Sequence, residues 1–442
     1  MRSHLALAAL LLLAGCVTPA AVDPGALAAQ EKDAMLRDLR ALLADVPCEV
    51  ASVGAQTSDN MLEIANLPYD GSEHGEIDAR GDWLLVARYQ AGGFEVVSLA
   101  DPGAPALVSV FQSEEENAQD VKWMPDDRTA VVGVNRKVLL VDVGPVIDAA
   151  GSMTPERMAD AGIAPVLLGE WEYPRDPRNP HDFIANMHML TTARIGETDY
   201  VFVAPNTDTG VWLLKREGDA LEHVTHFGAP LGGSALGPHD MSLAWDEKMQ
   251  APVLYVANGF EGWLAWDVSV PETPKLLAVM PNLDPGAVSY THSALGAWVG
   301  DRRLVVTIGE VGVNMMKVYD ATNWQAPVLL GVWWADKARP HMPQHNIQIV
   351  GERLYVAHYT EGVLVFDLST IGRLPLLSSL GIAPIARYAP PERETPDSLG
   401  FGNVWDVVVH RGLLYVNDMS RGTAVVGYGC LLPGDEAATS VN

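Results

Sequence analysis

The sequence has few basic residues, few cysteines and none of the common catalytic motifs. Its 442 residues include 29 Lys and Arg against 56 Asp and Glu, a formal net charge of −27. Such a surface repels phosphate backbones, which excludes nucleic acid as a partner. No pair of the three cysteines has redox spacing. A Gly-x-Ser-x-Gly elbow, a phosphate-binding Gly-rich loop and a His-Glu-x-x-His zinc motif are all missing, so those active sites are excluded.

The first 15 residues have the pattern of a secretory signal peptide. Arg2 precedes an apolar run from Leu5 to Leu13, which is too short to span a bilayer. The next residues complete Leu13-Ala14-Gly15-Cys16, which resembles the bacterial lipobox. The resemblance implies that Cys16 is diacylated and anchors the chain in a membrane. Val17, where Asp would favour the inner membrane, implies an outer-membrane lipoprotein facing the periplasm or the cell surface. The alternative is an ordinary signal with a chance cysteine.

Residues 16–48 are expected to form a lipidated tether and one short helix. Residues 17–30 are rich in Ala, Pro and Gly, as in a linker. Residues 31–43 have apolar side chains at helical spacing. With Cys16 assigned to lipid, Cys48 and Cys430 remain as a pair, and an exported location permits a disulfide between them. It would clasp the two ends of the following domain; the alternative is two unpaired buried thiols.

The main part of the chain, residues 49–442, carries a long-period repeat. Histidines recur at the start of short alternating segments. The consecutive histidines at positions 188, 239, 292 and 345 are separated by 51, 53 and 53 residues. A Val-, Leu- and Tyr-rich segment follows each histidine, and a third segment ends near an Asp. Seven such units can be counted, separated by turn residues. Units of about fifty residues with four strands each predict an all-β fold, a seven-bladed β-propeller.

The third segments also carry a family resemblance. Leu364-Val365-Phe366-Asp367-Leu368 and Leu139-Leu140-Val141-Asp142-Val143 resemble the LVIVD-repeat family. The resemblance covers residues 74 to about 428 and implies a β-propeller. These motifs are short and apolar, so they indicate fold and not function.

In a propeller, the starts of the first strands and the loops after the second strands meet at one mouth of the central channel. Two sets of polar residues are therefore expected there. The first set, at the strand starts, is His74, Asp120, His188, His239, His292, His345 and Asp406. The second set, after the second strands, is Arg88, Asp208, Glu261, Glu310, His358, Glu361 and Asp418.

The histidines of the first set predict a metal site. Neutral imidazole suits Cu, Zn, Fe and Ni, and carboxylates commonly hold the far ring nitrogen. His188, His239, His292 and His345 come from four successive units, so three or four of them are expected to hold one divalent ion, with His74 apart. His181 is an alternative to His188, which is preferred for its distance to Tyr200. The other interpretations are structural histidines or an organic ligand.

Two functions follow from this mouth. The first is a membrane-anchored scaffold of the cell envelope, which binds a protein or small ligand through the His- and acid-lined mouth of its channel. The second is a metal-dependent enzyme, an oxidase or hydrolase, centred on the histidines. The chain is expected to be monomeric, and its sequence names neither substrate nor partner.

Overall fold

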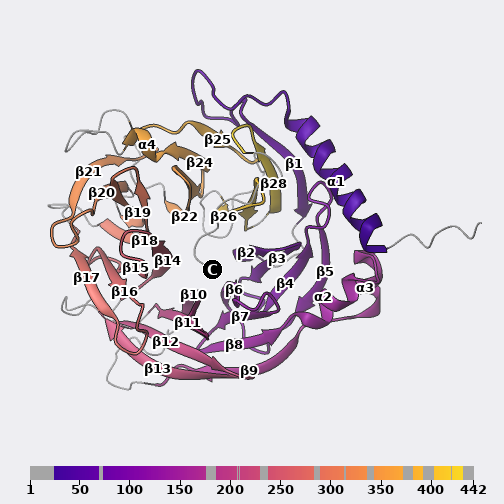
Figure 1. Ribbon diagram of the computed structural model, residues 1–442, viewed down its shortest axis with the longest axis horizontal. Helices are drawn as coiled ribbons and strands as arrows, with labels where there is room; N and C mark the ends of the chain where they lie inside the picture. The colour runs from indigo at the N-terminus through magenta and orange to yellow at the C-terminus, as the bar shows by residue number, and fades with distance from the viewer. Residues whose placement is uncertain are drawn as a thin grey trace, which may run out of the picture.

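The computed structural model describes residues 24–68, 73–175, 186–206, 208, 210–228, 237–282, 289–312, 315–335, 343–371, 382–391, 403–419 and 421–431. The expected signal peptide, Cys16 and His181 lie outside the described residues. The structure is a seven-bladed β-propeller, in which seven antiparallel four-stranded sheets surround a central channel (Figure 1).

Six blades are each made from four consecutive strands, the first of which is innermost. Blades one to three comprise β2 (His74–Arg80), β3 (Trp83–Arg88), β4 (Phe94–Ser98) and β5 (Ala106–Phe111); β6 (Ala118–Trp123), β7 (Thr129–Val134), β8 (Lys137–Asp142) and β9 (Val166–Glu172); and β10 (Met187–Ile195), β11 (Thr198–Pro205), β12 (Gly210–Glu217) and β13 (Ala220–Gly228). Blades four to six comprise β14 (Asp240–Asp246), β15 (Ala251–Ala257), β16 (Trp263–Asp267) and β17 (Lys275–Met280); β18 (Ser289–Val299), β19 (Arg302–Gly312), β20 (Met316–Asp320) and β21 (Val328–Trp333); and β22 (Gln344–Val350), β23 (Arg353–His358), β24 (Gly362–Asp367) and β25 (Ala386–Tyr388).

Blade seven joins the two ends of the chain and closes the ring. Its three inner strands are β26 (Val404–His410), β27 (Leu413–Asp418) and β28 (Gly422–Tyr428), and its outer strand is the N-terminal β1 (Met61–Pro68). The predicted disulfide is confirmed: Cys48 and Cys430 are bonded, with their Cα atoms 4.4 Å apart. Pairing of β1 with β28 brings the N-terminal part of the chain into the last blade and so holds the ring closed.

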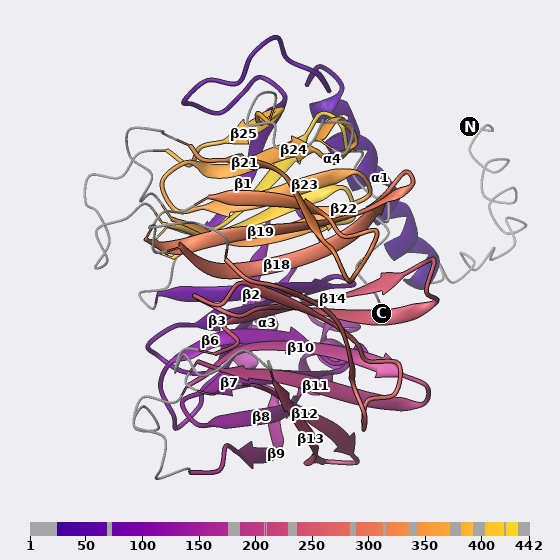
Figure 2. The same cartoon turned by 90° about the vertical axis from the view of Figure 1, so that its left-hand side faces the viewer.

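The helix before the propeller is longer than the sequence indicated. α1 spans Pro24–Leu43, so residues 24–30 are helical and the expectation of a tether there is wrong. Leu39 and Leu43 pack on the apolar surface shared by blades one and seven, which places α1 on the outside of the ring (Figures 1 and 2). Within the described part of the chain, no helix combines the length and hydropathy needed to cross a membrane.

Three shorter helices complete the structure. α2 (Gly144–Ala150) and α3 (Pro155–Ala161) fill the insertion between β8 and β9, where the sequence indicated a loop or short helix. α4 (Leu368–Ile371) follows β24 in blade six. None of them reaches the channel mouth in the view of Figure 1.

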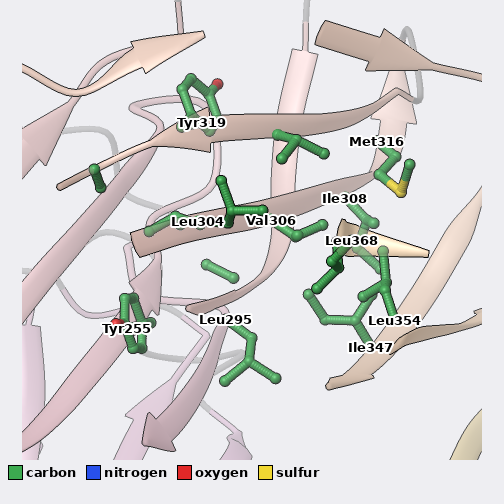
Figure 3. Packing of buried hydrophobic residues seen from close by; sticks show 14 of the residues in the cluster. Tyr255, Leu295, Leu304, Val306, Ile308, Met316, Tyr319, Ile347, Leu354 and Leu368 are labelled. Carbon is green, nitrogen blue, oxygen red and sulfur yellow. The ribbon is translucent and has the colours of Figure 1, made fainter. Parts of the chain in front are cut away.

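The hydrophobic core lies between neighbouring blades. Blade five packs through Leu304 and Val306 between Tyr255 of blade four and Leu354 of blade six, all fully or almost fully buried (Figure 3). Strands covered on both faces need apolar residues at successive positions, which explains the continuous Val- and Leu-rich segments of the sequence. The rigid packing fixes the inner strands, and these strands carry the candidate site.

Candidate metal centre at the channel mouth

A β-bulge recurs near the start of the innermost strands. In β22, Gln344 pairs with His358 and Ile347 with Val356, so His345 and Asn346 share one place in the ladder. The same irregularity occurs in β2, β6, β10, β18 and β26, and in blade four His239 and Asp240 both pair with one residue of β15. A bulge interrupts the alternation of side chains, and it allows two successive residues to reach the channel.

The bulges create two layers of side chains across the seven blades. The upper layer, at the mouth, consists of Gly75, Gln119, His188, His239, His292, His345 and Trp405. The lower layer, one residue further along each strand, consists of Glu76, Asp120, Met189, Asp240, Ser293, Asn346 and Asp406.

Three residues of the expected ring need correction. Asp120 and Asp406 belong to the lower layer, because Gln119 and Trp405 hold the upper positions. His74 precedes the bulge of blade one, where it lies buried with Nε2 3.4 Å from Glu95 Oε1. Gly75 takes the upper position, and a Cβ there would approach the carbonyl oxygen of Gln119 to 2.4 Å. Blade one therefore contributes no side chain to the upper layer.

The other four histidines form a continuous arc. The ring centroids of His188 and His239 are 4.1 Å apart, those of His239 and His292 4.5 Å, and those of His292 and His345 4.3 Å. The Nε2 atoms of His188 and His239 are 3.0 Å apart. Ligand atoms of His188, His239 and His292 lie within 4.8 Å of one another, as do those of His292, Glu310 and His345.

Two of these histidines have their outer ring nitrogen held by a carbonyl oxygen. Nδ1 of His345 lies 2.9 Å from the backbone oxygen of Trp405, and Nδ1 of His188 is in short contact with Oε1 of Gln119. A carbonyl oxygen only accepts, so Nδ1 carries the proton in both rings. The lone pair is therefore on Nε2, as in the histidine ligands of metal sites.

The environment keeps the four imidazoles neutral. Burial lowers the pKa of His188 to about 4 and that of His292 to about 3, and it holds the pKa values of His239 and His345 well below 6.5. Among the described residues, the ring nitrogens of the fully buried His292 make no hydrogen bond of good geometry, and Nε2 lies 3.5 Å from Oε2 of Glu310. A buried polar group without a partner costs about 1–3 kcal/mol, which a ligand at this point would offset.

Glu310 is the one member of the second predicted set that reaches the arc. Its Oε2 lies 3.5 Å from Nε2 of His292 and 3.8 Å from Nε2 of His239. Tyr359 donates a hydrogen bond of 2.9 Å to Oε1 of the same carboxylate. Burial raises the pKa of Glu310, and the Tyr359 hydroxyl acts in the opposite direction. A carboxyl group with the chemistry to bind a cation or to exchange a proton thus lies beside the arc.

The remaining members of that set lie in their own blades. Glu361 pairs with Arg387, and His358 is buried with its Nδ1 accepting from the amide of Glu361. The others bond to nearby groups: Arg88 to Gln112, Asp208 to Trp212, Glu261 to Asn258, and Asp418 to the amide of Arg421.

Several residues of the site were missed by the sequence analysis. Trp405 packs against His345 with ring centroids 3.9 Å apart and the ring planes tilted by 39°, and it donates from Nε1 to Glu76 at 2.9 Å. Tyr290 packs edge-on against His239 at 5.1 Å. Gln119 and Trp405 occupy the same repeat position as the histidines. Alignment of the seven units by position, without regard to residue type, would therefore have identified both residues.

Taken together, the fold and the site define a seven-bladed β-propeller with a buried histidine arc at one mouth of its channel. No known protein family and no curated protein matches the chain. Among solved structures, the chain is similar to the computationally designed Ika8 protein, at 13% identity and a TM-score of 0.49, over 83% of this chain and 99% of that one.

Proposed function

We propose that the mouth of this propeller binds one divalent transition metal ion, Cu, Zn, Fe or Ni. His188, His239 and His292 would supply nitrogen ligands, and His345 or Glu310 the next position. The observation that carries the proposal is the pair of Nε2 atoms of His188 and His239, which lie 3.0 Å apart, with Nδ1 of His188 already held by Gln119. Nitrogens bound to one tetrahedral zinc at about 2.0–2.1 Å are about 3.3 Å apart, close to this separation.

Metal analysis of the full-length protein, extracted in detergent and purified without a metal-binding tag, tests this proposal. We expect about one ion per chain, lost in His239→Ala. His223→Ala is the matched control, since His223 lies exposed on the outer strand β13 and should leave the metal content unchanged. A wild-type protein that stays metal-free after reconstitution with each of the four ions would overturn the proposal and leave a His–His hydrogen bond.

The same proposal includes a place for the protein in the cell. The lipobox-like Leu13-Ala14-Gly15-Cys16, followed by Val17, supports a lipoprotein of the outer membrane, and the channel mouth would be its scaffold for binding an envelope protein or small ligand. Cys16→Ser should move the protein from the membrane fraction to the soluble fraction. Equal membrane retention of the variant would contradict a lipid anchor at this cysteine.

A metal-dependent enzyme, an oxidase or hydrolase, is the second candidate, and Glu310 favours it. A bound ion with an open position would supply Lewis-acid or redox chemistry. Glu310, with its raised pKa and its bond from Tyr359, would hold or move a proton beside the ion. In this case His345 and not Glu310 is the fourth ligand, so Glu310→Gln should keep the metal and lose any activity found in a substrate screen, whereas unchanged activity would exclude this role.

A further inference from the structure

The propeller has a second face, opposite the histidine arc, which we call the rear face. The turns between the first and second strands of the blades lie on it, among them residues 81–82, 247–250, 300–301 and 411–412. In blades one to six the connections between third and fourth strands lie there as well, because neighbouring strands are antiparallel. The length of the first strands separates the mouth from the rear face, about 23 Å for the seven residues of β2.

The helix α1 is fixed to the rear side of the ring. Nζ of Lys32 lies 2.7 Å from Oδ1 of Asp82 in the turn between β2 and β3, and Arg411 contacts the same carboxylate from the turn between β26 and β27. Seven positions later, Leu39 is buried among residues of blades one and seven. Toward its first residue, Pro24, the helix therefore continues on the rear side of the ring (Figure 2).

The short segment before α1 favours one orientation of the ring on a membrane. Seven residues, 17–23, separate Cys16 from the helix. At about 3.6 Å per residue, the eight steps from Cys16 to Pro24 span at most about 29 Å. If the mouth faced the bilayer, most of this reach would be needed to pass the depth of the propeller. With the rear face toward the bilayer the segment keeps its conformational freedom, so this orientation has the lower entropic cost.

Exposed apolar side chains also gather on the rear face. Among the described residues, six of the eight large hydrophobic side chains that are clearly exposed lie at rear ends of strands or in rear connections: Met153, Val166, Leu167, Trp245, Val270 and Val328. Trp245 is 45% exposed and Val270 is 55% exposed. Contact with a lipid surface would remove these side chains from water.

The rear ends of blades four and five carry the residue types of a membrane–water boundary. Trp245 lies near the rear end of β14, and Lys248 follows in the turn to β15, with Nζ 3.6 Å from the ring centroid of Trp298. Tryptophan places an apolar ring and a polar N–H at the level of the headgroups, and lysine extends its ammonium group into water. Asp127 and Asp301 in rear turns would be repelled by anionic headgroups, so the surface fits zwitterionic lipid.

We propose that the rear face rests on a zwitterionic bilayer and that the histidine mouth points away from it. The proposal rests on the lipid anchor proposed above for Cys16, and it does not depend on a bound metal. Trp245 and Val270 would lie at the headgroup level, on the other side of the ring from α1. A ligand of the mouth would then approach from the aqueous side, without passing the membrane surface.

Fluorescence quenching of the full-length protein in phosphatidylcholine vesicles tests the orientation. Val270→Cys labels the rear face, and Phe260→Cys is the matched variant on the mouth side, in the turn between β15 and β16 of the same blade. The introduced thiol would be the reactive one, because Cys48 and Cys430 are bonded and Cys16 would carry lipid. With a spin label near the headgroups as quencher, we expect a dye at position 270 to be quenched about twofold more, or better, than one at position 260.

Co-flotation of the same samples with the vesicles reports on the anchor separately. Protein that does not float would overturn the anchor at Cys16 and this proposal with it. Protein that floats but shows equal quenching at both positions, or stronger quenching at position 260, would keep the anchor and overturn the orientation. If Val270→Cys does not fold, Val328→Cys provides a second exposed position on the rear face, in blade five.

Discussion

Nε2 of His188 and Nε2 of His239 face each other at 3.0 Å, although the residues belong to different blades and are 51 positions apart in sequence. The contact depends on the bulge of β10 and on the start of β14, which turn both rings toward the axis. At this distance two neutral imidazoles share one proton in an Nε2–H···Nε2 hydrogen bond. A metal ion would replace that proton and accept the lone pairs of both Nε2 atoms.

Gln119 is expected to tune the metal affinity without contacting the metal. Its Oε1 holds Nδ1 of His188 and fixes the tautomer. Gln119→Leu should therefore weaken metal binding about 10- to 100-fold, as measured by competition with a chromogenic chelator. The exposed Gln112→Leu serves as the control. Equal affinities of Gln119→Leu and the wild-type protein would show that Gln119 has no role in orienting the ligand.

The disulfide is expected to contribute strongly to stability. Cys48 and Cys430 are separated by 382 residues, and cross-links that close long loops restrict the unfolded chain most. The double variant Cys48→Ser/Cys430→Ser should lose about 2–5 kcal/mol of unfolding free energy in a denaturant titration. Dithiothreitol should lower the stability of the wild-type protein and not that of the double variant. Unchanged stability on reduction would mean that β1–β28 pairing suffices to close the ring.

Asp406 joins three blades and should be sensitive to truncation. Its Oδ2 accepts from the amide of Ile77 at 3.0 Å, and its Oδ1 accepts from Asn346 at 3.0 Å. Asp406→Ala leaves the buried amide of Ile77 without an acceptor and leaves Asn346 with Glu76 alone, at a cost of about 1–3 kcal/mol. Asp127→Ala, at an exposed aspartate, should cost less than about 1 kcal/mol. A loss for Asp406→Ala no greater than this control would contradict the inter-blade role.

His358 should make the stability depend on pH. Burial, with a smaller effect of Arg387, lowers its pKa to about 3. Between pH 6.5 and about 3 the unfolded chain binds a proton here that the folded protein does not. The stability it contributes is complete above pH 6.5 and decreases as the pH falls, by up to about 1.4 kcal/mol per pH unit.

Raised carboxyl pKa values change the stability in the opposite direction as the pH falls. The contribution of His358 is therefore best measured as the difference in stability between a His358 variant and the wild-type protein. Burial raises the pKa of Asp240 to about 6, which favours the folded state as the pH falls toward 4. We expect the pH slope of the unfolding free energy between pH 6.5 and 4 to be smaller in His358→Gln than in the wild-type protein. Exposed His223→Gln should keep the wild-type slope. The same slope in both variants would mean that His358 is protonated in the folded protein.

The sequence predicted the parts of this structure that depend on periodicity. Alternating strands, a repeat of about fifty residues and two flanking cysteines sufficed for seven blades and for the disulfide. The four histidines of the arc share a repeat position, so their meeting was predictable as well. α1 was predicted too short, because residues 24–30 contain Pro24 and Gly25, and Pro is compatible with the first turn of a helix.

The rest of the site depends on backbone detail and on residues of a different type. Strict alternation places the residue after each histidine on the opposite face, and only the bulge brings Asp240 and Asn346 into the channel. Gly75, Gln119 and Trp405 hold the histidine position with unrelated side chains, so a search for histidines shifted the assignment to His74, Asp120 and Asp406. Glu310 was found because it lies near the end of the second strand of its blade, but the six other residues predicted by the same rule make their contacts elsewhere.

The covalent link between the first and last parts of the chain also determines how the protein responds to force. A pull applied to the N-terminal side of Cys48 passes through the disulfide into Cys430 and then into β28, ahead of β1. The outer strand β1 of blade seven therefore carries no tension, and the closed ring bears the applied force as a single unit. After reduction the same pull would reach β1 first and shear it from β28, so that the propeller would open at this one seam.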